Sequence, residues 1–144
     1  MDSGATIRDG CSGDEAAVFA LWDRAYDDGG GHRQPDDVSR ILAGGTGARL
    51  LVAEVGTRVA GALVAGYDGW RGTMYGLAVD PDYRRRGIAG ALVSEAEAWL
   101  ESIGCHRITA LVVKDHPWAT GFWESAGYAL DDFMGRYSRN LGGP

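Results

Sequence analysis

A run of arginines and glycines stands between an apolar segment and a long amphipathic segment, and this combination suits phosphate binding. The stretch is Leu77 to Gly90, with the sequence LAVDPDYRRRGIAG. Asp80-Pro81 ends a strand, because proline cannot donate to a ladder and aspartate favours turns. A helix that begins near Gly87 presents free amides and its positive dipole end to the loop. The same residues also fit a plain strand–turn–helix connection with a solvated arginine run, and both interpretations stand at this level.

Other kinds of chemical site find little support in the residue spacing. Neither G-x-x-x-x-G-K-[ST] nor a G-x-G-x-x-G that follows a strand is present. Cys105 and His106 are adjacent, so on a strand their side chains would point to opposite faces, and no four-ligand spacing exists. We therefore expect no metal, and a phosphate site that is neither a P-loop nor a Rossmann turn.

Hydrophobic spacing and turn residues predict the elements that must position this loop. Their order is β-α-α-β-β-β-α-β-α-β, a mixed α/β domain with one dominant sheet. The glycine-rich segment 27–32 is predicted to be a flexible loop. The elements are a strand at 5–8, a helix at 14–26 behind a Ser12-x-x-Glu15 capping box, a helix at 35–43, strands at 49–55, 58–67 and 72–79, a helix from about 87 to 103, a buried strand at 107–113, a helix at 117–126, and a final strand or strand pair at 128–130 and 133–137.

Composition limits the possible partners. The chain has 144 residues, which predicts one domain over residues 1–144. A net charge of −6 argues against a nucleic-acid partner, because nucleic-acid binding depends mostly on basic surfaces that neutralise phosphates. No apolar run approaches the ~20 residues of a membrane span, and the N-terminus lacks the features of a signal peptide. With two cysteines far apart in the sequence, we expect a cytoplasmic protein with reduced thiols.

Two motifs resemble those of the GNAT superfamily of N-acetyltransferases. Residues 77–89 read Leu-x-Val-x-Pro-x-Tyr-Arg-x-x-Gly-x-Ala, and Arg84 to Ala89 resemble its pyrophosphate-binding signature Arg/Gln-x-x-Gly-x-Gly/Ala. Downstream, His116-Pro-Trp-Ala-x-x-Phe-Trp-x-x-x-Gly-Tyr is similar to the family's Asn-x-x-Ala-x-x-Phe-Tyr-x-x-x-Gly-Phe/Tyr. The stretch Gly66–Gly72 further looks like a small bacterial subgroup, the YpeA-type acetyltransferases.

The resemblance implies an α/β fold of the GNAT type, with a mostly antiparallel sheet that splays between strands four and five. It also implies acetyl-coenzyme A as co-substrate, with its pantetheine lying in the splay against the backbone of Leu77 and Val79. Backbone amides from Arg85 through Ala89, with Gly90, would hold the pyrophosphate. The implied cofactor-binding residues are Leu77, Ala78, Val79, Arg84, Arg85, Arg86, Gly87, Ile88, Ala89, Gly90, His116, Phe122 and Trp123.

The chain departs from the family pattern at the groups that move protons. Many relatives carry a glutamate base on the fourth strand, where this chain has Met74-Tyr75-Gly76. Glu54 is either a base that acts through water or an exposed hairpin residue, and the base is left unassigned. Trp123 occupies the place of the tyrosine acid, and an indole N–H cannot deliver a proton at neutral pH.

Three residues remain as candidate catalytic groups: Tyr75, Tyr128 and His116. Packing is the favoured alternative for the two tyrosines, and a loop histidine before Pro117 can be incidental. A thiol leaving group has a pKa near 8.5, so failure to protonate it at pH 7 costs only about 2 kcal/mol. Loss of the acid is therefore compatible with catalysis.

We expect an N-acetyltransferase that moves acetyl from acetyl-coenzyme A to a primary amine by direct attack in a ternary complex. The alternative is a non-catalytic acyl-coenzyme A-binding module of the same fold, and a third hypothesis, a scaffold that uses Arg84–Arg86 to bind protein or nucleic acid, conflicts with the acidic pI. The expected acceptor is a small-molecule or peptide amine, with no nucleic-acid or membrane partner, and the chain is a monomer or homodimer. A set of acids would suit a cationic amine or be a solvated surface: Asp23, Asp27, Asp28, Asp36, Asp37 and Asp68.

Overall fold

The computed structural model describes residues 4–26 and 33–142, and the chain forms two compact units, residues 1–111 and 112–144. The loop predicted at 27–32 lies outside the described residues. The first unit holds a sheet in the order β1-β2-β3-β4-β5, antiparallel except for the parallel pair β4–β5. Its elements are β1 (Thr6–Asp9), the 3-10 turn η1 (Ser12–Asp14), α1 (Glu15–Ala25), α2 (Asp37–Leu42), β2 (Ala48–Val55), β3 (Arg58–Tyr67), β4 (Gly72–Val79), the 3-10 turn η2 (Pro81–Tyr83), α3 (Ile88–Ser102) and β5 (Ile108–Ala110).

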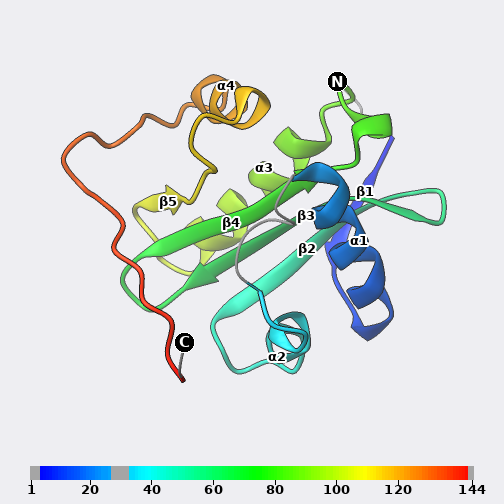
Figure 1. Ribbon diagram of the computed structural model, residues 1–144, viewed down its shortest axis with the longest axis horizontal. Coiled ribbons are helices and arrows are strands. Elements are labelled where there is room, and N and C mark those ends of the chain that lie inside the picture. The colour runs from blue at the N-terminus through cyan, green and yellow to red at the C-terminus, as the bar shows by residue number, and fades with distance from the viewer. Residues whose placement is uncertain (1–3, 27–32, 143–144) are drawn as a thin grey trace. The chain divides into compact units, whose positions relative to one another are not determined.

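One face of the sheet is covered by α1 and α2, and α3 lies on the other face (Figure 1). The apolar stripe of α1 buries Val18, Leu21 and Trp22, as the helical spacing predicts. These side chains pack with Val52 of β2 and Val64 of β3 in one core cluster. Alternate residues of each strand point to opposite faces, so the intervening residues are left to face α3.

The packing of α3 against β3 leaves no room for a side chain at Gly61. A Cβ there would lie 2.9 Å from Ile88 and 3.1 Å from Leu92 of α3. Both α3 residues are almost fully buried, at 2% and 0% exposure. The long helix therefore sits close to the strands that precede the arginine loop, and its start is fixed relative to the end of β4.

The second unit contains α4 (Pro117–Ser125), with proline in its first turn and Gly127 just after its end, as the sequence predicts. Its buried residues are Ala119 and Trp123. No described helix of either unit is long and apolar enough to cross a membrane.

The predicted capping box at Ser12-x-x-Glu15 is wrong by one residue. The turn η1 begins after Cys11, and the carboxylate of Asp14 accepts from the Cys11 amide at 2.8 Å. Asp14 also takes two hydrogen bonds from Arg8, at 2.7 and 3.0 Å. Because the ion pair with Arg8 fixes the position of the buried Asp14, the reciprocal cap forms one residue earlier than the local pattern indicates.

The strands predicted after residue 106 are also wrong in extent. β5 covers only Ile108–Ala110 and is half-buried, where a buried strand over 107–113 was predicted. Residues 128–142 form no strand, against the prediction at 128–130 and 133–137. Their apolar side chains are exposed, with Phe133 at 83% and Tyr137 at 99%. A strand is stabilised by its neighbours, and local β-type composition alone does not supply them.

Candidate functional site

A β-bulge interrupts β4 at Gly76. Between the pairs Val64–Tyr75 and Ala62–Ala78, two residues of β4, Gly76 and Leu77, stand opposite one residue of β3. Gly76 has φ +67, a left-handed conformation that glycine adopts without steric cost. This bulge was not predicted, although a lone glycine inside a strand pattern is a signal for one.

The bulge changes which way Tyr75 points. Cross-strand partners share a face of the sheet, so Tyr75 shares the face of Val64, and Ala78 that of Ala62. Val64 and Ala62 belong to the core cluster under α1 and α2. In a regular strand, residues three apart lie on opposite faces, but the extra residue brings Tyr75 and Ala78 to the same one.

The edge of β4 that faces β5 is paired over only its first three residues. Gly72, Thr73 and Met74 pair with β5, and the Leu111 amide donates to the Met74 carbonyl at 2.8 Å. Within the described part of the first unit, the stretch from Tyr75 to Val79 has no ladder partner on that edge. This is the separation between strands four and five that the sequence analysis expects.

Leu77, Ala78 and Val79 form the buried part of this edge, each with at most 3% exposure. Two side chains hold the backbone at the start of this segment, Trp22 of α1 and Tyr26 directly after that helix. The Trp22 indole donates to the Gly76 carbonyl at 2.8 Å, and the Tyr26 hydroxyl donates to the Leu77 carbonyl.

The loop after β4 starts at a buried carboxylate. Asp80 is 3% exposed, accepts from the Asp82 amide at 2.9 Å, and donates its own amide to the Ala60 carbonyl at 2.8 Å. Arg24 of α1 pairs with it at 2.6 Å, and Arg58 of β3 approaches to 3.5 Å. A buried carboxylate is tolerated when it is paired and hydrogen-bonded, so this network fixes where the loop begins.

The arginines and glycines that follow surround the open N-terminus of α3. Arg85 and Gly87 both have left-handed φ, +66 and +79, and Gly87 caps the helix. No atom lies within 4 Å of a Cβ built on Gly87 or on Gly90, so the backbone there is accessible. Arg86 stacks its guanidinium 4.9 Å from the ring of Tyr83. Free amides, the helix dipole and three arginines fit a diphosphate group.

The structure thus brings the predicted residues of the first unit into one continuous track. It runs from Tyr75 along the open edge of β4 to Val79, and then through Arg84–Gly90 at the start of α3. Ile88 and Ala89 are buried, while Arg85 and Arg86 are exposed.

Tyr75 is 37% exposed, and its pKa is raised above the usual value by burial and by the negative charge of Asp37. A raised pKa keeps the phenol protonated at neutral pH, so the group can donate a proton or a hydrogen bond but is not a base. Asp37 lies at the start of α2, where its carboxylate accepts from the Gln34 amide at 2.6 Å.

Glu54, which the sequence left open as a base that acts through water, is engaged in an ion pair. Arg8 donates to it at 2.9 Å and at the same time to Asp14. The hydrogen bond from Arg8 is the main reason that the pKa of Asp14 falls from 3.8 to about 2. These three residues form a charge network at the β1–β2 end of the sheet, and Glu54 there serves that network.

The remaining predicted residues lie in or next to α4 in the second unit. His116 caps the helix: its Nδ1 accepts from the Ala119 amide at 3.3 Å, so a neutral ring carries its proton on Nε2. Phe122 stacks on Trp118 at 5.7 Å and meets Trp123 edge-on at 5.4 Å. Trp123, at 5% exposure, packs edge-on against Tyr128 at 4.9 Å.

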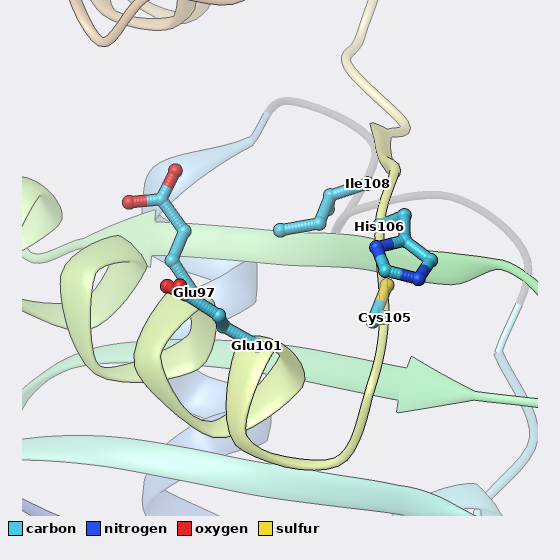
Figure 2. A pocket seen from close by; sticks show the side chains of 5 residues that line it. All are labelled: Glu97, Glu101, Cys105, His106 and Ile108. Carbon is cyan, nitrogen blue, oxygen red and sulfur yellow. The ribbon is translucent and has the colours of Figure 1, made fainter.

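A separate hollow of about 450 Å³ lies between the end of α3 and β5 (Figure 2). It is lined by Glu97, Glu101, Cys105, His106 and Ile108. Ile108 pairs with Gly72, so the hollow lies at the opposite end of β4 from the arginine loop. Glu97 and His106 stand on opposite sides of it and do not converge (Figure 2). Among residues 4–26 and 33–142, no three His, Cys, Asp or Glu side chains are grouped to hold a metal ion.

Comparison with known proteins identifies related sequences and folds. The model of the acetyltransferase (GNAT) family matches residues 16–128. An acetyltransferase of Sodalis glossinidius (strain morsitans) is 45% identical over 83 residues, which are 58% of this chain and 58% of that protein. The chain thus matches little more than half the length of such curated relatives.

Solved structures share the fold over nearly the whole chain. A transcriptional regulator from Bacillus halodurans C-125 superposes with a TM-score of 0.74 and 26% identity, covering 95% of this chain and 99% of the other. The aminoglycoside acetyltransferase AAC(6')-Iy, in complex with the bisubstrate analogue CoA-S-monomethyl-acetylneamine, gives a TM-score of 0.76 at 17% identity, with coverage of 95% and 99%.

Proposed function

Because the chain belongs to the acetyltransferase (GNAT) family, we propose that it transfers an acetyl group from acetyl-coenzyme A to a primary amine. The amine attacks directly in a ternary complex. The observation that carries this proposal is the continuous track formed by the open edge of β4 and the exposed amides at the start of α3. The family match runs through both units, which supports a single acetyltransferase domain over residues 1–144.

Within this proposal, the first unit binds the donor through its backbone. Leu77 and Val79 offer strand-type hydrogen bonds along the unpaired edge, and Ala78 between them pairs with Ala62 of β3. Amides from Arg85 to Gly90 hold the diphosphate, and Arg84–Arg86 add positive charge. When bound, acetyl-coenzyme A supplies an activated thioester and a thiol leaving group. We keep His116, Phe122 and Trp123 as proposed donor-binding residues because their motif resembles that of the family.

Proton transfer has to be managed without a carboxylate on β4, whose eight residues are GTMYGLAV. An amine must be neutral to attack, and an α-amine has a pKa of about 7.7–8.0, against about 10.4 for lysine. We infer that the acceptor loses its proton to solvent. His116 could accept a proton only by giving up its cap on α4. Tyr75 stays protonated and lies on β4 where the open edge begins, so it serves as the proposed acid, with Tyr128 as the second candidate.

The acceptor is a small-molecule or peptide amine in this proposal, and no metal, membrane or nucleic acid takes part. The positive charge of the acceptor would be attracted by Asp37, whose negative charge also raises the pKa of Tyr75. Asp68, by contrast, accepts two amides within the β3–β4 turn and serves that turn. We keep the YpeA-type subgroup, a cytoplasmic location and a monomer or homodimer as proposals. Cys11 and Cys105 are free thiols, which agrees with a reducing compartment.

The experiment has two parts, binding and turnover. Calorimetry should detect acetyl-coenzyme A, and thiol release should follow when an amine is added from a panel of aminoglycosides, polyamines, lysine peptides and peptides with a free α-amine. The rate should rise with pH as the productive amine loses its proton. Absence of binding at millimolar acyl-coenzyme A contradicts the proposal. Binding without thiol release for any amine supports the alternative, a non-catalytic acyl-coenzyme A-binding module, which the missing carboxylate on β4 favours.

A further inference from the structure

The guanidinium of Arg33 lies against two aromatic rings and a carboxylate of α1. Its Cζ is 4.9 Å from the centre of the Phe19 ring and 5.8 Å from that of the Trp22 ring. One of its nitrogens lies 2.5 Å from Oδ1 of Asp23. Aromatic faces attract cations within about 6 Å of the ring centre, and a planar guanidinium stacks on them. Phe19, Trp22 and Asp23 therefore form a guanidinium site, the α1 cation site.

The α1 cation site is built by one helix. Its three residues stand at positions i, i+3 and i+4 of α1, so they lie on one face of the helix. The Phe19 and Trp22 rings meet edge-on at 5.9 Å. Trp22 is 9% exposed, and its indole N–H donates to the Gly76 carbonyl at 2.8 Å, which fixes the ring. The site is thus formed by α1 itself and does not depend on Arg33.

The same tryptophan places the α1 cation site beside the bulge of β4. A Cβ on Gly76 would approach Cζ2 of Trp22 to 3.2 Å. Tyr75 precedes Gly76 and shares the sheet face that α1 and α2 cover. A donor anchored by its phosphates at residues 84–90 and laid back along β4 from Val79 meets Gly76 about 10 Å further on, at ~3.3 Å per strand residue. The α1 cation site therefore lies toward the acetyl end of the donor.

Arg33 is a replaceable occupant of this site. The side chains of Arg33 and Asp23 are 25% and 61% exposed. An ion pair that is open to solvent contributes little to stability, and a cation–π contact at such a position is also weak. The guanidinium of a ligand that makes further contacts at the bulge can therefore take the place of Arg33.

We propose that the α1 cation site binds a guanidinium group of the acceptor, and that Arg33 occupies it when no acceptor is bound. The acceptor is then a primary amine joined to a guanidinium by a short alkyl chain, because a single indole ring separates the site from the bulge. Its guanidinium stacks on Phe19 and Trp22 and pairs with Asp23, and its amine lies toward the acetyl group. This specificity rests on the proposed function.

A pair of matched ligands tests the charge that the site requires. Aminobutylguanidine has a primary amine and a guanidinium, and in aminobutylurea an uncharged urea of the same shape replaces the guanidinium. Calorimetry measures the affinity of each for protein saturated with coenzyme A, and thiol release from acetyl-coenzyme A gives the KM of each. Wild-type protein should bind aminobutylguanidine at least about tenfold more tightly than aminobutylurea.

Variants then separate the α1 cation site from general attraction by acidic residues. Arg33→Gln should strengthen aminobutylguanidine binding by about three- to tenfold, because the competing guanidinium is gone. Adding Asp23→Asn to Arg33→Gln should cancel this gain. Adding Phe19→Leu instead, which changes no charge, should also reduce it.

The matched control is Arg49→Gln. Arg49 also pairs with an exposed aspartate, Asp9 at 2.7 Å, and also lies over an indole, that of Trp99 at 5.1 Å. Its side chain is 28% exposed, close to the value for Arg33, but Trp99 belongs to α3 on the other face of the sheet. This variant should keep the affinity for aminobutylguanidine within about twofold of wild type.

The outcomes distinguish this specificity from the proposed function. Wild-type protein that binds no acetyl-coenzyme A overturns the proposed function, and the acceptor role of the site with it. Wild-type protein that binds coenzyme A and binds the urea as tightly as the guanidine overturns the specificity alone, and this result needs no variant. A folded Arg33→Gln protein with unchanged or weaker guanidine binding also overturns it, because Arg33 is then only a structural contact.

Discussion

Replacement of Gly87 by aspartate should abolish donor binding while the protein stays folded. Gly87 caps α3 with φ +79, and no atom lies within 4 Å of the position that a Cβ would take. A left-handed L-residue costs roughly 1–2 kcal/mol, and less for aspartate than for most residues. A negative charge at a helix N-terminus returns about 0.3–1 kcal/mol. The net change in the free energy of unfolding should stay within about 1 kcal/mol.

The effect on binding should be much larger. The new carboxylate would stand at the proposed diphosphate site, and two like charges about 5 Å apart repel by about 3 kcal/mol at an effective dielectric constant of 20. A diphosphate carries more than one such charge. We therefore expect the dissociation constant for acetyl-coenzyme A to rise at least about 100-fold, since about 1.4 kcal/mol corresponds to a factor of ten.

The matched control is Gly104→Asp at the other end of the same helix. Gly104 also has a left-handed φ, +93, with no atom within 4 Å of a Cβ. The same carboxylate there meets the negative end of the dipole, so this variant should be less stable than Gly87→Asp and bind acetyl-coenzyme A normally. Calorimetry and thermal unfolding measure both quantities. A folded Gly87→Asp protein with wild-type affinity would refute the phosphate site at α3.

Three further changes test other parts of the structure. Because the pKa of Asp14 is lowered from 3.8 to about 2, its stabilising contribution is complete above about pH 4 and is lost as the pH falls through 2. Arg8→Met should remove that pH dependence and lower the free energy of unfolding at pH 7 by about 2 kcal/mol, as measured by urea unfolding. Stability that falls between pH 4 and pH 2 as in the wild type would contradict this. Gly76→Ala should lower the free energy of unfolding by about 1–2 kcal/mol, because an alanine at φ +67 is strained and its Cβ contacts Trp22. The melting temperature should fall, and an unchanged melting temperature would contradict the left-handed conformation at the bulge. Asp80→Asn should lower the free energy of unfolding by about 3 kcal/mol and weaken acetyl-coenzyme A binding, because Arg24 and Arg58 lose the buried charge that they pair with. Unchanged stability would contradict the anchoring role of Asp80.

Local signals were sufficient for most of the elements and for the loop that they present. The spacing of Val18, Leu21 and Trp22 predicted the buried face of α1, and the strands 58–67 and 72–79 have the bounds that the sequence indicated. Arg84–Arg86 lie in the loop between β4 and α3, and Gly87 caps α3, as the sequence predicted. Each of these features depends on residues close in the chain.

Features that depend on distant partners were missed or misplaced. The donors to the β4 bulge are Trp22 of α1 and Tyr26 directly after it, more than fifty residues earlier in the chain. No local pattern shows which side chain meets which carbonyl. The capping box moved by one residue because Arg8 binds Asp14. Tyr128–Leu130 has β-type composition, yet the structure gives it no strand, because a strand requires neighbours that composition does not specify.

The most direct test of the central claim is to map donor binding residue by residue. Acetyl-coenzyme A should be titrated into isotopically labelled protein while the backbone amide resonances are followed. The account predicts that the largest changes fall on residues 75–79 and 84–90, the open edge of β4 and the start of α3. Changes confined to the hollow at Glu97 and His106, or no changes at all, would contradict it.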